Sequence, residues 1–250
     1  MNNNEVSFGL VQFPVVKGSI EQNFLEHKKC VEVAARNGVD VVVFPELSLT
    51  GYEPTLASNL AIDVESNVVK QLSIVAKENG VVVVSGCPLK SAESRPFIGA
   101  IISYPSGKTD FCRKQHLHTG ESEYFVAGKG SYFFNYKEQR IALAICADFS
   151  NPIHAAEAKA ANADVYLSSV LVSDNGFDVD SQQLQGYASE HNFAVLMANH
   201  NAEIGGWKTC GKSRAWDSQG KLAVASENNA SSLVICAVSA GKVSGNVLKI

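Results

Sequence analysis

The chain has 250 residues, of which 46% are hydrophobic and 18% charged, and its formal net charge is −4 at pH 7. This balance is typical of a globular protein and argues against disorder, and the slight acidity excludes the basic surface that nucleic-acid binding needs. No apolar run is long enough to span a bilayer, and the first residues lack the cationic, apolar and cleavage regions of a signal peptide, so we expect a cytoplasmic protein with no membrane partner.

Three apolar stretches in the first half of the chain are typical of β-strands: residues 6–13, 39–44 and 81–86. The stretch 39–44 is an unbroken β-branched run, which indicates a strand covered on both faces. Helices are predicted between these strands. Ser19 and Gln22 form the pattern of a capping box, after which apolar residues recur at helical spacing until Gly38. A second helix with the same periodicity ends at Gly80.

The second half of the chain mixes hairpins with further helices. Two pairs of strands are predicted to run antiparallel: 97–104 with 109–114, around the turn PSGK, and 131–136 with 140–146. Helices at 154–163 and 182–191 alternate with strands at 164–170 and 193–199, and the last predicted strands are 211–217, 222–226 and 232–239.

This order of elements predicts one α/β domain over residues 1–250, built on one mixed sheet or on two sheets that lie face to face with helices outside. No linker, low-complexity segment or repeat interrupts the chain. No glycine-rich phosphate loop follows any strand, so a nucleotide site has no support.

The first polar interruption of an apolar strand is FPELSLTGY, directly after residues 39–44. Glu46 lies there behind Pro45. A loop glutamate is ordinarily a solvated surface residue, but ligand sites of α/β sheets lie just beyond the carboxyl ends of strands. Leu47 and Leu49 indicate partial burial, and a buried carboxylate needs a partner. Glu46 is therefore a candidate site residue.

The second interruption is RKQHLHTGESEYF, in which Lys114 ends a hairpin strand and is followed by His116, His118, Glu121 and Glu123. One interpretation is an exposed charged loop. In another, the lysine and the carboxylates stabilise one another inside a cleft. The two histidines share one face of an extended segment, but no third ligand with suitable spacing follows, so we expect no metal.

The third interruption is ICADFSNP, where a buried strand ends at Cys146. Six cysteines are spread along the chain without a CxxC pair, and we expect all of them to be reduced and most to be small core residues. A sharp turn after a strand also suits a nucleophile, because it exposes the side chain and turns backbone N–H groups toward one point. From these residues alone, Cys146 is a core residue or a nucleophile.

The three stretches together resemble the nitrilase, or carbon–nitrogen hydrolase, superfamily, whose motifs occur here in the same order as FPELSLTGY, RKQHLHTGESEYF and ICADFSNP. The resemblance continues more weakly through ADVYLSSV, ASEHNFAVLMAN and GKSRAWDSQGKL, so it extends over nearly the whole chain. It implies a four-layer α-β-β-α sandwich that pairs into a homodimer or a higher homo-oligomer.

The resemblance also implies residue roles. Glu46 matches the general base, Lys114 the catalytic lysine and Cys146 the nucleophile. Glu121 matches a second glutamate beside the lysine, although Glu123 is only two residues away.

In the mechanism that the resemblance implies, Lys114 favours the thiolate, and Glu46 takes the thiol proton as the sulfur attacks. The oxyanion is held by Lys114 and by the backbone N–H of Ala147. Glu46 then activates the water that hydrolyses the thioester, and no metal or organic cofactor is needed. Asp148 is interpreted as a brace for the turn and not as the partner of the thiol.

The expected reaction is hydrolysis of an amide or carbamoyl C–N bond in a small molecule. Nitrile hydrolysis and acyl transfer on the same residues, and a non-catalytic binding or regulatory relative, are the alternatives. Tyr52, Ser169 and Trp207 are candidate pocket residues.

Two features of the loops bear on the substrate. No arginine follows Cys146 to hold a substrate carboxylate. Glu53, Asp174 and Asp178 favour either an amine-bearing substrate or simply a soluble surface.

Overall fold

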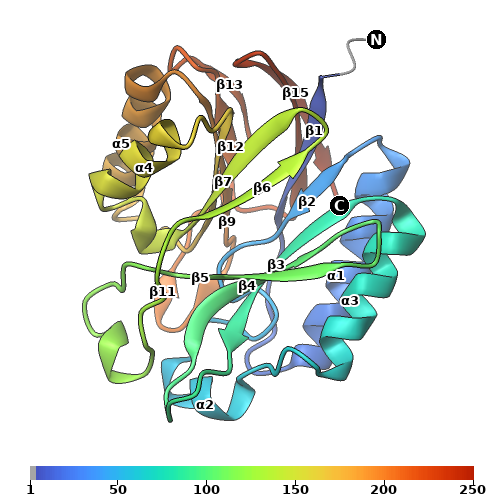
Figure 1. Cartoon of the computed structure of the whole chain (residues 1–250), viewed down its shortest axis with the longest axis vertical. Coiled ribbons are helices and arrows are strands. Elements are labelled where there is room, and N and C mark those ends of the chain that lie inside the picture. The colour runs from blue at the N-terminus through green and yellow to red at the C-terminus, as the bar shows by residue number, and fades with distance from the viewer. Residues whose placement is uncertain (1–3) are drawn as a thin grey trace.

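Two mixed β-sheets lie face to face in the computed structural model, which describes residues 4–250 (Figure 1). The first sheet has the order β15-β14-β1-β2-β3-β4-β5 and the second β13-β12-β9-β8-β7-β6. In the first, β1, β2 and β3 are parallel, and in the second, β7, β8 and β9 are parallel. Antiparallel strands flank both parallel centres.

The strands of the first sheet are β1 (Val6–Gln12), β2 (Val41–Val43), β3 (Val82–Leu89), β4 (Phe97–Ser103), β5 (Thr109–Arg113), β14 (Ser232–Ser239) and β15 (Lys242–Lys249). The strands of the second sheet are β6 (Tyr132–Tyr136), β7 (Gln139–Ile145), β8 (Val165–Val170), β9 (Ala194–Asn199), β12 (Arg214–Trp216) and β13 (Leu222–Ala225). A separate short hairpin consists of β10 (Glu203–Ile204) and β11 (Trp207–Lys208).

Helices form the two outer layers (Figure 1). α1 (Ile20–Arg36) and α3 (Asn67–Asn79) cover the first sheet, and α4 (Pro152–Ala160) and α5 (Phe177–His191) cover the second. The short helices are α2 (Ala57–Leu60), η1 (Pro54–Leu56), η2 (Glu121–Glu123) and η3 (Cys146–Asp148). The predicted α/β fold, a four-layer α-β-β-α sandwich with two mixed sheets, is confirmed.

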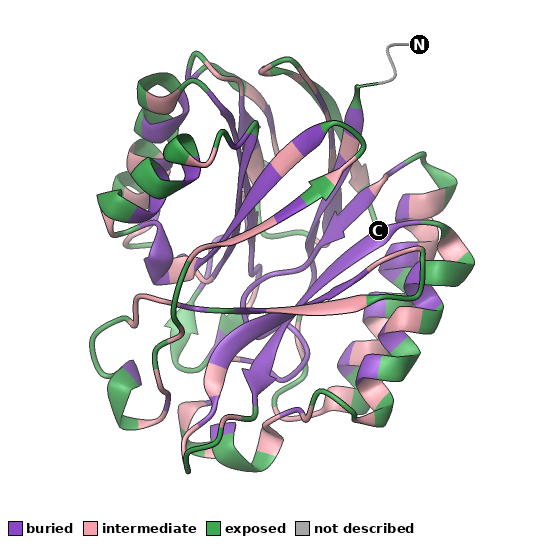
Figure 2. Cartoon of the chain, viewed as in Figure 1, coloured by how far each residue is buried: buried purple, intermediate pink, exposed green. Residues whose placement is uncertain are grey.

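Alternation of side chains along the strands builds three packed layers. In β7, Ile141, Leu143 and Ile145 enter the core between the two sheets, whereas Ala142 and Ala144 face the helices. Figure 2 shows the result, with strands buried along most of their length and helices exposed on their outer sides. The apolar run that ends at Cys146 is thus fixed on both faces, which holds its last residue in place.

Three details differ from the sequence-based predictions. The capping box is wrong, because the Ser19 side chain makes no capping hydrogen bond. Asn23 instead bonds to the backbone of the segment before the helix. Its side chain accepts a hydrogen bond from Val16 N–H and donates one to Val16 O, both at 2.8 Å. α5 begins at Phe177, five residues earlier than predicted. β15 and the β10–β11 hairpin were not predicted.

Within residues 4–250, no helix is both long enough and apolar enough to cross a lipid bilayer.

Candidate active site

The loop after β2 holds Glu46 in a fixed position beyond the carboxyl end of that strand. Leu47 adopts a left-handed φ of 53°, which turns the chain sharply after Glu46. A Cβ at Gly86 in β3 would overlap the backbone nitrogen of Leu47, so the close approach of this loop requires glycine. The backbone carbonyl of Glu46 accepts a hydrogen bond from His200 Nε2 at 2.6 Å. Burial lowers the pKa of His200 to about 4, so a neutral imidazole makes this contact at pH 7.

Lys114, directly after β5, makes charge-assisted hydrogen bonds with two carboxylates. Its Nζ donates to Glu46 Oε1 at 2.8 Å and to both oxygens of Glu121 at 2.9 Å. All three side chains are at most 2% exposed. Burial works against the lysine charge, but the acidic groups around it outweigh burial and raise the pKa of Lys114 above its ordinary value. The ammonium therefore stays charged at neutral pH.

Glu121 is the glutamate that reaches the lysine. It opens the short helix η2 and is buried, whereas Glu123 at the end of that helix is exposed. Glu121 also accepts hydrogen bonds from the Tyr52 hydroxyl at 3.0 Å and from the backbone N–H of His118 at 2.7 Å. These contacts satisfy a carboxylate that would otherwise be costly to bury.

Cys146 begins η3 at the end of β7, with a left-handed φ of 43°. Its side chain is partly exposed, and the thiol donates to Leu171 O at 3.5 Å. Burial and the charge of Glu46 raise the pKa of the Cys146 thiol well above its ordinary value, and the opposing effect of Lys114 is smaller. Lys114 acts in the expected direction, toward the thiolate, but burial and the carboxylate charges outweigh it, so Cys146 rests as a thiol.

The carboxylate of Glu46 has two oxygens in different surroundings. Oε1 accepts from Lys114, whereas the buried Oε2 has no hydrogen-bond partner among residues 4–250. Burial raises the pKa of Glu46 to about 7, against the effect of Lys114 and with the help of Glu121, and the neighbouring Cys146 thiol acts on it too. Glu46 can therefore exchange a proton near neutral pH.

Asp148 fixes the turn after Cys146 to the loop that carries Lys114. Its Oδ1 accepts from the backbone N–H groups of Gln115 at 2.9 Å and His116 at 2.8 Å, and its Oδ2 accepts from Ile145 N–H at 3.0 Å. The interpretation of Asp148 as a structural brace is confirmed by these contacts.

The candidate pocket residues have different surroundings. Tyr52 contacts Glu121 as described, and Ala147 is buried beside Cys146. Trp207 in β11 is 42% exposed and meets the His118 ring edge-on at 6.2 Å between centroids. Ser169, in contrast, is fully buried and its hydroxyl donates to Phe44 O at 2.8 Å. This contact ties β8 to the segment before Glu46, and the role of Ser169 in the pocket stays a prediction.

His116 and His118, the hypothetical metal pair, have different neighbours. His116 Nδ1 lies 3.3 Å from Asn151 Nδ2, and its ring meets His154 edge-on. His118 contacts Trp207 instead. No group of three potential ligands suitable for a metal ion occurs within residues 4–250.

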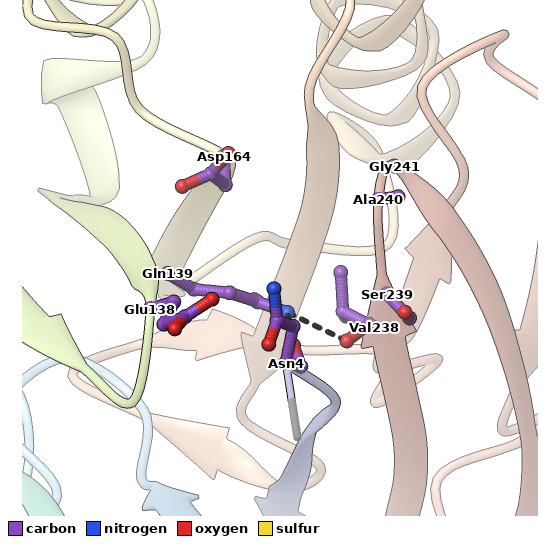
Figure 3. Close-up of a pocket in the computed structure, with 8 residues that line it drawn as sticks. All are labelled: Asn4, Glu138, Gln139, Asp164, Val238, Ser239, Ala240 and Gly241. Atoms are coloured by element: carbon purple, nitrogen blue, oxygen red, sulfur yellow. Dashed lines mark hydrogen bonds between the residues drawn. The ribbon is translucent and has the colours of Figure 1, made fainter. Parts of the chain in front are cut away.

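A polar cavity of about 430 Å³ lies away from these residues, at the start of β7 and β8 (Figure 3). Gln139 points into this region and donates to Val238 O at 2.6 Å. Because Cys146 follows the opposite end of β7, this cavity is separate from the Glu46–Lys114–Cys146 cluster.

Sequence reasoning missed His200. It follows β9 directly, and β9 is parallel to β8 in the centre of the second sheet. The rule that ligand sites lie beyond the carboxyl ends of parallel strands applied to this position as well and would have found it.

Comparisons with known proteins agree on one family. The sequence profile of the carbon–nitrogen hydrolase family matches residues 8–245. That match lies within the single domain predicted over residues 1–250, whose limits stay a prediction. A curated relative, a nitrilase from Pyrococcus abyssi, is 28% identical over 151 residues, which are 58% of this chain and 57% of the relative. The chain thus spans little more than half the length of the curated relative that it matches.

Solved structures match over more of the chain. A mutant of the amidase from Nesterenkonia sp. AN1, which carries the acetamide moiety of fluoroacetamide on its active-site cysteine, is 19% identical with a TM-score of 0.88. The match covers 96% of this chain and 93% of that one. XC1258 from Xanthomonas campestris, a CN-hydrolase superfamily protein with an arsenic adduct in its active site, is 20% identical, with a TM-score of 0.87 and coverage of 94% and 91%.

Proposed function

The chain belongs to the carbon–nitrogen hydrolase family, and from this premise we propose that it hydrolyses the C–N bond of a small-molecule amide or carbamoyl compound. Cys146 is the nucleophile in this proposal, Glu46 the general base and Lys114 the electrostatic partner of both. Glu121 positions Lys114.

One observation carries the proposal. The Lys114 ammonium bridges two buried carboxylates, and one of them, Glu46, keeps a free oxygen beside a partly exposed thiol. Burying three ionisable side chains costs free energy that a purely structural site would avoid by using apolar residues. Perturbed titratable groups of this kind cluster at catalytic sites.

The chemistry follows from the protonation states. Cys146 rests as a thiol, so its proton passes to Glu46 Oε2 while sulfur bonds to the carbonyl carbon. The negative charge that develops on the substrate oxygen is stabilised by Lys114 and by the backbone N–H of Ala147. Glu46 gives the proton to the leaving nitrogen, which departs as ammonia or an amine and leaves a thioester.

Water completes the reaction. Glu46, ionised again, removes a proton from a water molecule that attacks the thioester carbon, and the thiol leaves with that proton. The products are a carboxylic acid and the free enzyme. The oxygen of Glu46 that bonds to Lys114 keeps the carboxylate oriented through both halves, because Lys114 is itself held by Glu121.

Amides are the preferred substrates in this proposal. A matched structure of the amidase from Nesterenkonia sp. AN1 is a complex with butyramide, and that match covers 96% of this chain. The relative named as a nitrilase matches over a much shorter stretch. Nitrile hydrolysis and acyl transfer use the same three residues and are the alternatives.

The test is ammonia release from a panel of small aliphatic amides, carbamoyl amines and nitriles. We expect release from amides or carbamoyl compounds by the wild-type protein and none by Cys146→Ala. The variant should keep the wild-type melting temperature and circular dichroism spectrum, because Cys146 is partly exposed. A folded Cys146→Ala protein that releases ammonia at the wild-type rate would refute the proposal, and a wild-type protein inactive on the whole panel would favour a non-catalytic relative.

A further inference from the structure

Two segments form a rim around the Glu46–Lys114–Cys146 cluster. On one side, the β10–β11 hairpin lies directly against Tyr52, since a Cβ at Gly205 would overlap the Tyr52 carbonyl. The Tyr52 hydroxyl reaches Glu121. Trp207, in the same hairpin, contacts His118, whose backbone N–H also bonds to Glu121. The hairpin therefore contacts Tyr52 and His118, which both donate hydrogen bonds to Glu121.

The segment between β8 and α5 continues the rim. It starts at Leu171, whose carbonyl accepts from the Cys146 thiol. Ser173 pairs with Thr209 in an isolated bridge, and Asp174 N–H donates to Lys208 O at 2.9 Å. These contacts join the segment to the β10–β11 hairpin, so the rim is continuous from Cys146 to Trp207.

Asp180, in the first turn of α5, packs on this segment. Its Oδ2 lies 3.2 Å from the point that a Cβ of Gly176 would occupy, and Gly176 N–H in turn donates to Ser173 Oγ. The side chain is partly buried, and within residues 4–250 it has neither a salt bridge nor a hydrogen bond. Burial raises the pKa of Asp180, and the nearby His118 acts against that shift.

The other acidic side chains considered for this region already have cationic partners. Glu53 bonds to Lys17 at 2.9 Å, and Asp174 lies 3.3 Å from Lys208. Asp178 is exposed, and its charge acts on Arg214. Within residues 4–250, Asp180 is the half-buried carboxylate of the rim that has no salt bridge to a lysine or an arginine. Such a group gains free energy from a cation that it can bind.

We propose that Asp180 is a subsite for a protonated amine on the substrate, and that the preferred substrates are aliphatic amides with a second, positively charged nitrogen. This inference rests on the proposed function. The amide group enters at Cys146, the alkyl chain lies along the rim, and the ammonium pairs with Asp180. The ammonium would supply for Asp180 the kind of salt bridge that Lys17 makes with Glu53 and Lys208 makes with Asp174.

The kinetic test compares amino amides of increasing length with neutral amides of the same length. We expect the amino amide of one particular length to exceed its neutral match in kcat/KM by about tenfold or more. Asp180→Asn should bring this ratio close to one. Asp180→Glu should keep a preference for the amine and shift it to a chain shorter by about one methylene. Asp178→Asn is the matched control, and it should keep the wild-type ratio.

A binding test separates this inference from the proposed function. Calorimetry with Cys146→Ala measures the affinity for the same amide pairs without turnover, alone and combined with Asp180→Asn. Tighter binding of the amino amide that disappears with Asp180→Asn supports the subsite, even if the wild-type protein releases no ammonia. Equal binding of charged and neutral amides, or a preference that survives Asp180→Asn, would overturn it.

Discussion

Glu46 and Cys146 have pKa shifts that point to one sequence of proton movements. The pKa of Glu46 is raised by burial to about 7 and that of Cys146 is raised well above its ordinary value. At pH 8 the site thus holds an ionised base beside a protonated thiol, and below pH 7 the base is lost. Activity should fall as the pH falls through about 7, with an apparent pKa that belongs to the whole cluster.

The rate at which iodoacetamide alkylates Cys146 at each pH measures how the ionisation of Glu46 activates the thiol. The other five thiols are buried, so faster labelling of Cys146 alone would report only its exposure. We expect its labelling rate to rise with pH through about 7, as Glu46 ionises. In Glu46→Gln this inflection should disappear, while the labelling of the buried thiols stays slow. An unchanged profile in the variant, or a Cys146 that labels no faster than the other thiols, would contradict the assignment of Glu46 as the base.

Lys114→Met should reduce kcat by about 10²–10³-fold with a smaller change in KM, because the ammonium acts mainly on the charge of the transition state. It should also lower the free energy of unfolding by about 3–5 kcal/mol, since two buried carboxylates lose their partner. A double variant, Lys114→Met with Glu121→Gln, removes one of the orphaned charges. It should regain stability in urea denaturation but not turnover.

A wild-type kcat in either folded variant would exclude this role for Lys114.

The three main residues could be predicted from sequence because each one interrupts an apolar strand at its end. The choice between Glu121 and Glu123 could not, because both lie in one loop and only packing decides which one is buried. Asp180 was not singled out either. In the sequence it is one of several carboxylates in this region. Its special property, that no lysine or arginine within residues 4–250 forms a salt bridge with it, is visible only in the structure.

At the scale of elements, buried strands and amphipathic helices were predictable because their periodicity is strong. β15 was not, since its residues are mostly exposed and it forms by pairing with β14 through a turn at Ala240 and Gly241, both with positive φ. The β10–β11 hairpin has only two residues in each strand and no apolar alternation. The start of α5 was placed too late because its first turn carries Asp178 and Asp180, which suggest a loop.

Asp148 connects two elements, and its removal should disturb both. Asp148→Ala leaves three backbone N–H groups without their acceptor, which should lower the free energy of unfolding by about 3 kcal/mol and loosen the turn after β7. The measurement is urea denaturation together with kcat. Asp164→Asn is a matched control at the other end of β7, where the exposed Asp164 accepts one bond from Arg140 N–H at 2.8 Å.

The control should change stability by less than about 0.5 kcal/mol. If Asp148→Ala is no less stable than this control, Asp148 is not the brace.

At the scale of the whole molecule, the site exists only where the two sheets meet. Glu46 and Lys114 come from the first sheet, at the ends of β2 and β5, and Cys146 comes from the second, at the end of β7. Sequence order shows that each residue follows a strand, but the distances between them depend on the stacking of the sheets. The motifs therefore predict which residues meet, and packing fixes how they meet.

The homodimer expected from the sequence stays a prediction, and we place its interface at the outer helix layer of the second sheet. Ile153 on α4 is 61% exposed and Val179 on α5 is 69% exposed, and the two helices contact each other. An interface there would bury both side chains. We expect light scattering to give the mass of a dimer or a larger homo-oligomer, and Ile153→Glu with Val179→Glu to weaken it. A monomer at micromolar concentration would show that this prediction is wrong.

In the proposed reaction the acyl group of the substrate is transferred to the Cys146 sulfur first, and water then attacks the resulting thioester. Hydroxylamine added during turnover of a small amide tests this most directly, because it intercepts a thioester and yields a hydroxamate. We predict hydroxamate that increases with hydroxylamine concentration in the wild-type protein, and neither hydroxamate nor ammonia with Cys146→Ala. Ammonia released without hydroxamate at any hydroxylamine concentration would contradict the thioester and with it the role assigned to Cys146.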